Sequence, residues 1–161
     1  MKMKTLGLAG LLLMLAAPAQ AAEKITTTLN DEGTGDGATH GVYFSGSCGE
    51  ECLMAGLTCN GSGSLEVQMI DIPAKEAAKS ILRDNSVLVM TIGSTRHDMS
   101  VSRFSFSEMN GSWDVDATAG DPDAVYKGLA DAKSFKLSLE KQSATLPVTS
   151  DVKAWAKSCL K

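Results

Sequence analysis

Apolar and polar residues alternate along much of the chain, which predicts β-strands with one buried face. The clearest run contains Phe135, Leu137 and Leu139, each separated from the next by a polar residue. Asn110-Gly111 is the strongest signal for a tight hairpin between two such strands. Strands are expected over residues 24–29, 42–44, 64–72, 87–92, 101–106, 113–117, 135–140 and 145–148.

Three other stretches repeat their apolar residues every three or four positions, which predicts amphipathic helices. Pro73 opens the first helix, and its apolar stripe extends over residues 74–82. Asp121 caps the second helix and Pro122 occupies its first turn. Ser150 caps the third, and the spacing turns a cysteine toward the interior. The apolar face of this last helix comprises Val152, Trp155, Ala156 and Cys159.

These elements predict an α+β fold, in which about three helices pack on one face of a mainly antiparallel sheet. The order strand, helix, strand, strand occurs twice, over residues 64–108 and 112–159. Two βαββ repeats of about 48 residues are therefore expected, because a recurring order of elements at such a period is what a duplicated unit produces.

The first 21 residues have the features of a secretory signal peptide. Lys2 and Lys4 give a basic start, residues 6–15 form an apolar run, and Ala19-Gln20-Ala21 matches a cleavage site. The run is about half the length of a membrane span, so no span is expected. We expect cleavage near Ala21, export to the periplasm or the medium, and a single α+β domain over residues 22–161.

Four cysteines in an exported chain predict two disulfides. Cys48, Cys52 and Cys59 lie close together in the sequence, whereas Cys159 lies near the other end. One of the two bridges must therefore reach Cys159, and by loop entropy it contributes about 4 kcal/mol. A Cys48–Cys52 bridge closes a very tight loop and is disfavoured. Two pairings stay open: Cys48–Cys59 with Cys52–Cys159, and Cys52–Cys59 with Cys48–Cys159.

The charge balance excludes some partners. The chain has 15 basic and 19 acidic residues, and loss of the two leader lysines leaves 13 − 19 = −6. No cluster of Lys and Arg suitable for phosphates is evident, so neither nucleic acid nor an anionic membrane is expected as a partner.

No complete catalytic set emerges from the sequence, and no catalytic residue, metal or cofactor is assigned. Arg96, His97 and Asp98 form a polar surface cluster, interpreted as an exposed hairpin tip. Cys48-x3-Cys52 is one residue too long for a redox motif, and a serine hydrolase would need His40 or His97 as its base. A calcium loop would use Asp31, Glu32 and Asp36, although their spacing misses the usual pattern.

The last third of the chain, from Asp123-Ala124-Val125-Tyr126 through Trp155-Ala156-Lys157-Ser158-Cys159, resembles small exported bacterial proteins of the invasion-associated locus B type. The resemblance rests on a helix, a strand, a short return and a helix with a near-terminal cysteine. It implies an envelope-associated protein that is not an enzyme, and it carries over no functional residues.

The favoured function is therefore an exported, non-enzymatic binding protein that contacts a protein or envelope component, or a host, through sheet edges or loops. One alternative is a small exported hydrolase or thiol-redox enzyme with scattered catalytic residues. Another is a calcium-dependent binding module.

Overall fold

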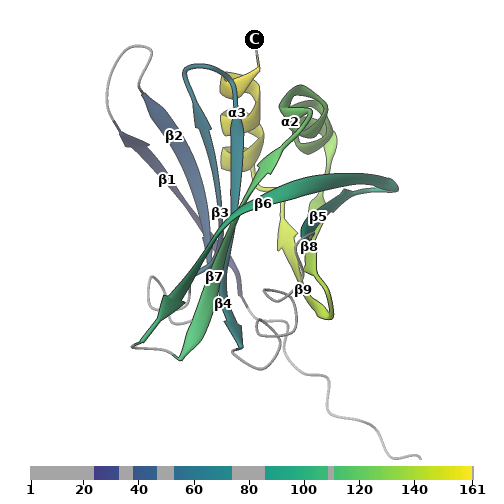
Figure 1. Cartoon of the computed structure of the whole chain (residues 1–161). Coiled ribbons are helices and arrows are strands. Elements are labelled where there is room, and N and C mark those ends of the chain that lie inside the picture. Colours follow the sequence, from purple (N-terminus) through teal and green to yellow (C-terminus); the bar gives the residue numbers. More distant parts are fainter. Residues whose placement is uncertain (1–23, 33–37, 47–52, 74–85, 109–110, 161) are drawn as a thin grey trace, which may run out of the picture.

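One antiparallel sheet of nine strands forms most of the structure (Figure 1). The computed structural model describes residues 24–32, 38–46, 53–73, 86–108 and 111–160. The strands follow the order β1-β2-β3-β4-β7-β6-β5-β8-β9, and every pair is antiparallel. The elements are β1 (Thr26–Glu32), β2 (Thr39–Ser45), β3 (Leu53–Asn60), β4 (Leu65–Pro73), β5 (Val87–Ile92), β6 (Thr95–Ser107), β7 (Ser112–Ala119), α2 (Pro122–Asp131), β8 (Ser134–Leu139), β9 (Gln142–Pro147) and α3 (Ser150–Cys159).

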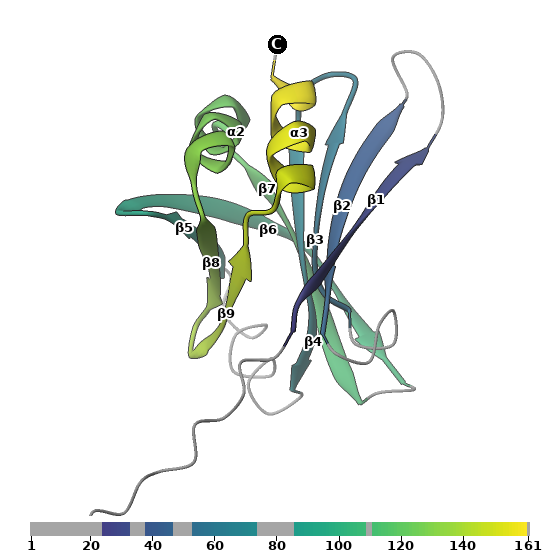
Figure 2. The ribbon, with the colours of Figure 1, turned by 180° about the vertical axis from the view of Figure 1, so that it is seen from behind.

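The prediction of an α+β fold is wrong, because strands make up 62% and helices only 18% of the described residues. The sheet curls into a half-barrel, and α2 and α3 lie side by side within its concave side (Figures 1 and 2). The strands of the two expected βαββ repeats are interleaved, with β4 beside β7 and β5 beside β8, so they do not form two separate halves. The first expected helix lies outside the described residues, apart from Pro73, which ends β4.

The curl of the sheet brings its two ends together around one apolar core. Phe44 on β2 and Phe135 on β8 are second and eighth in the strand order, yet their rings meet edge-on with centroids 5.4 Å apart. The hydroxyl oxygens of Thr27 on β1 and Thr149, just after β9, lie 3.2 Å apart. The alternating apolar residues fill the interior between these contacts, as at Val42 on β2 and Leu137 on β8, which have no exposed surface.

Both helices begin at side-chain caps that fix where the chain turns into the concave side. The Ala124 amide donates to the carboxylate of Asp121 at 3.1 Å, and Pro122 follows in the first turn, as predicted. The cap of α3 is Thr149, which accepts from the Val152 amide at 3.4 Å, so the expected cap is displaced by one residue from Ser150. Both helices are ten residues long.

Two aromatic side chains hold the helices against the strands. The Tyr126 hydroxyl on α2 donates to the Ser64 carbonyl at 3.1 Å, and the Trp155 ring nitrogen on α3 donates to the His40 carbonyl at 2.8 Å. The two rings pack edge-on, with centroids 5.7 Å apart. Burial raises the pKa of Tyr126 well above its ordinary value, because the ionised phenolate would lose its hydration. No helix in the described part of the chain is long and apolar enough to cross a membrane.

A disulfide joins Cys59 at the end of β3 to Cys159 at the end of α3, with Cα atoms 6.1 Å apart. The prediction that one bridge reaches Cys159 is therefore confirmed, but both favoured pairings are wrong because each gave Cys59 a different partner. Cys48 and Cys52 lie outside the described residues. Only one disulfide is described, and a second within this chain would have to join those two cysteines.

Loss of the long disulfide should destabilise the whole domain. The bridge spans 100 residues, so replacing Cys59 with alanine should lower the free energy of unfolding by about 4 kcal/mol through loop entropy. Denaturant unfolding under oxidising conditions measures this change. Cys159→Ala and the double variant should match Cys59→Ala, since all three remove the same bridge. A Cys59→Ala protein as stable as the wild type would contradict the pairing.

Tyr126→Phe should weaken the protein in a pH-dependent way. At pH 7 the variant loses a buried hydrogen bond, which costs about 1 kcal/mol. Because burial raises the pKa of Tyr126 in the folded protein, this side chain contributes its full stabilisation below about pH 10. Above about pH 10 the tyrosine ionises in the unfolded chain but not in the folded protein, so the stabilisation falls as the pH rises. The stability difference between wild type and variant should therefore narrow above about pH 10. Urea unfolding from pH 7 to 11 tests this, with Tyr43→Phe as the control.

Candidate functional site

A row of polar side chains crosses four neighbouring strands on the convex face of the sheet, away from the helices. Thr91 on β5 lies directly opposite Arg96 on β6 and Lys136 on β8, and Lys136 lies opposite Thr145 on β9. Residues directly opposite each other in an antiparallel sheet have their side chains on the same face. Their sequence neighbours, such as Phe135, are buried on the other face. The row is therefore a consequence of strand register.

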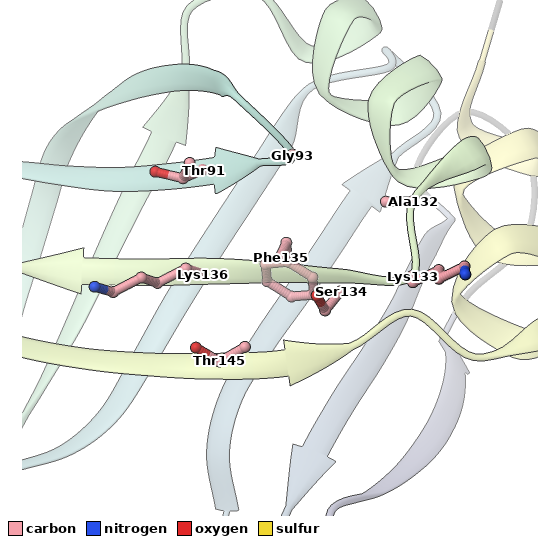
Figure 3. Close-up of a pocket in the computed structure, with 8 residues that line it drawn as sticks. All are labelled: Thr91, Gly93, Ala132, Lys133, Ser134, Phe135, Lys136 and Thr145. Carbon is pink, nitrogen blue, oxygen red and sulfur yellow. The ribbon is translucent and has the colours of Figure 1, made fainter.

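Part of this row lines a shallow pocket of about 400 Å³ (Figure 3). Its polar side chains are hydroxyl groups and ammonium groups, and none of the lining residues is acidic. Lys133 and Lys136 point toward opposite ends of the pocket, with the hydroxyl-bearing residues between them (Figure 3). The lining comprises Thr91, Gly93, Ala132, Lys133, Ser134, Phe135, Lys136 and Thr145.

The pocket is built on regular backbone. Lys133 lies in the short link between α2 and β8, and its carbonyl accepts from the Val148 amide at 2.9 Å. This bond ties the link to the segment that follows β9. Phe135 is 2% exposed and packs on Phe44, so the strand below the pocket is anchored in the core. A rigid strand with fixed neighbours holds binding groups more accurately than a loop does.

A second pocket of about 370 Å³ adjoins the first and shares Lys133, Ser134 and Thr145 with it. It adds the half-buried side chains of Ile25, which precedes β1, and of Pro147 at the end of β9. Hydroxyl and ammonium groups therefore continue into a partly apolar surface near the edge of the sheet.

The sheet separates the three residues of the predicted polar cluster. Arg96 and Asp98 share the convex face, where the guanidinium nitrogen lies 2.6 Å from the carboxylate and both side chains are exposed. His97 lies opposite Met90, which is fully buried on the concave face. The hairpin turn is Gly93-Ser94, and residues 95–98 already belong to β6, so the cluster is part of a strand.

The other candidate residues do not assemble around a reacting group in the described structure. His40 lies 2.9 Å from the Asp31 carboxylate at an exposed position. Glu32, one position along β1, instead accepts from the Asn30 amide at 3.0 Å, so the two acids face away from each other. Asp36, like Cys48 and Cys52, lies outside the described residues. In the regions described, no three His, Cys, Asp or Glu side chains lie close enough to hold a metal.

The lysine and hydroxyl pocket is not visible in the sequence pattern. Alternation along β8 places Lys136 opposite to the buried face, and the same reasoning applies to Thr145 on β9. Which residues lie side by side depends on the pairing of β5 with β8, and these strands are separated in the sequence by β6, β7 and α2. Local pattern indicated only the two strands over residues 135–140 and 145–148.

The chain matches no protein-family model, no curated protein and no solved structure. The resemblance to invasion-associated locus B proteins therefore stays a hypothesis.

An ion pair with a buried carboxylate lies elsewhere on the convex face. The Asp116 side chain on β7 is only 3% exposed, and the Arg103 side chain that pairs with it on β6 is 66% exposed. The guanidinium donates to the carboxylate at 2.6 Å, and this hydrogen bond raises the pKa of Arg103. Because a buried carboxylate needs a countercharge, we interpret the pair as structural.

Arg103→Met should therefore lower the melting temperature by about 5 °C, because it leaves the buried carboxylate of Asp116 without its cation. Asp116→Asn added to that variant should recover part of the loss, since an amide needs no countercharge. Arg96→Met is the matched control, because its pair with Asp98 is exposed on both sides and should contribute less than about 1 °C. Equal effects of the two arginine changes would contradict this interpretation.

Proposed function

We propose that the protein is an exported binding protein that holds an extended anionic saccharide of the cell envelope in the lysine and hydroxyl pocket. The observation that carries the proposal is the pocket lining, where Lys133 and Lys136 flank Ser134, Thr91 and Thr145 with no acidic side chain among them. In a chain whose formal net charge is −4, such a group of cations is a local reversal of sign.

The arrangement of the donors favours an extended ligand. Two ammonium groups directed to opposite ends of the pocket suit acidic groups that are spaced along a chain, rather than one compact phosphate (Figure 3). Hydroxyl groups both donate and accept hydrogen bonds, as sugar hydroxyls do. The adjoining surface of Ile25 and Pro147 offers apolar contact for a sugar ring. A volume of about 400 Å³ suits one or two sugar units at a time.

Binding is favoured over catalysis by the contents of the pocket. Its lining holds no histidine, cysteine or carboxylate, and in the described structure neither lysine hydrogen-bonds to a lining serine or threonine, so no activated nucleophile is assembled there. His40 and His97 are not among the lining residues. These features support a binding site, and the proposal assigns no reaction to it.

The export of the protein is part of the proposal. The signal-like residues 1–21 motivate it, and the Cys59–Cys159 disulfide supports it, because disulfides persist mainly in oxidising compartments such as the periplasm. An envelope saccharide is accessible in that compartment. The hypothetical relationship to invasion-associated locus B proteins points to the same location.

Isothermal titration calorimetry with a uronic-acid trisaccharide and its neutral counterpart tests the ligand class. We expect the acidic sugar alone to bind, with an affinity that falls as salt is added. Lys133→Gln/Lys136→Gln should weaken binding at least tenfold. Lys127→Gln/Lys157→Gln removes the same charge from exposed helix positions and should leave the affinity within about twofold of wild type.

Equal binding of the acidic and neutral sugars would contradict the proposal. An unchanged affinity in the Lys133→Gln/Lys136→Gln variant would place the binding elsewhere on the protein. Both double variants should show the wild-type melting temperature, because all four lysine side chains are exposed and none of them belongs to an ion pair among the described residues.

A further inference from the structure

Strand β1 is the edge of the sheet that is least protected against pairing with another strand. It comes first in the strand order and pairs only with β2. It is seven residues long, six of them exposed, and its register with β2 has no irregularity. Natural proteins usually blunt such edges with a proline, a lysine or a bulge. Residues 26–32 contain none of these, and their only charges are Asp31 and Glu32 at the end of the strand, whereas β9, at the other edge, is shorter and ends at Pro147.

An exposed apolar side chain occupies the centre of this strand. Leu29 is 48% exposed, although it lies opposite the fully buried Val42 of β2. The side of Leu29 that faces away from β2 is therefore uncovered within the described structure. Only Val87 and Phe106 are comparably exposed among the large apolar residues described.

The sequence of β1 is complementary to itself in one arrangement. If two copies run antiparallel about Leu29, the two leucines face each other and Thr28 lies opposite Asn30. Asp31 and Glu32 then lie opposite threonines, so no like charges meet. A parallel pairing in register would instead set each acid beside its own copy.

A charge pair strengthens the antiparallel arrangement. Lys24 lies two residues before Thr26, and Thr26 would face the partner's Glu32. Side chains two positions apart on facing strands are diagonal neighbours within reach of a long lysine. Each copy would contribute one such lysine and one such glutamate, so the contact occurs twice in a symmetric pair.

We propose that the protein forms a twofold dimer through β1, in which the two edge strands pair antiparallel about Leu29 and one continuous sheet crosses both copies. The occupant of this edge is a second copy of the chain, because the self-complementary order of apolar, neutral and acidic residues fits that partner. The inference does not depend on the proposed saccharide site.

Sedimentation equilibrium over a range of protein concentrations tests the dimer. Wild-type protein should be dimeric, and Leu29→Lys should raise the dissociation constant at least tenfold, because it opposes two ammonium groups at the twofold axis. Val87→Lys is the matched control, since Val87 is 39% exposed and lies on an interior strand, and it should dimerise like the wild type. Circular dichroism should show the same fold in all three proteins.

A covalent trap provides a second readout. Leu29→Cys should give a disulfide-linked dimer on a non-reducing gel, whereas Val87→Cys should remain a single chain under the same oxidation. A wild-type protein that is monomeric at every concentration would overturn the proposal. So would a Leu29→Lys variant that associates as tightly as the wild type, or a dimer that Leu29→Cys fails to trap.

Discussion

The need to cover one wide apolar face determines how this chain folds. The strands present most of their buried apolar side chains on one side, but the two helices that the structure describes against that side are only ten residues long. Two short helices cannot cover a flat sheet of this width. The sheet therefore curls until its own ends supply the remaining cover, which is why Phe44 on β2 packs against Phe135 on β8. The Cys59–Cys159 disulfide then fastens the last helix to the third strand.

The same curl divides the surface into regions with different properties. Side chains that alternate with the core residues are turned outward, and on β5, β8 and β9 they include Thr91, Lys136 and Thr145. Asp116 is an acid at an outward position in the middle of the sheet, and Arg103 on the neighbouring strand supplies its countercharge. Polar character on the convex face is therefore partly structural, whereas the lining of the lysine and hydroxyl pocket holds two cations and no acid.

Local pattern predicted much of the secondary structure and little of its arrangement. Apolar residues at every second position correctly indicated strands such as β8, and Asp121-Pro122 indicated the start of α2. Both signals depend only on residues that are close in the sequence. The α+β class was wrong because sheet order and curl depend on contacts between distant residues. The same limit explains the disulfide, since sequence spacing did not reveal that Cys59 at the end of β3 faces the end of α3. Arg96 and His97 lie on opposite faces for a local reason, because successive side chains of β6 alternate, and the interpretation of residues 96–98 as a hairpin tip hid this.

The two proposals are connected by geometry, although each stands alone. The lysine and hydroxyl pocket is lined by residues of β5, β8, β9 and the segments next to them, and none of its lining residues belongs to residues 24–32, which would form the dimer contact. A dimer would then carry two equivalent sites. An envelope saccharide repeats its acidic groups along a chain, so engagement of both sites on one chain would raise the overall avidity above that of a single shallow pocket. Under the proposed function, presenting this shallow pocket twice would strengthen retention at the envelope.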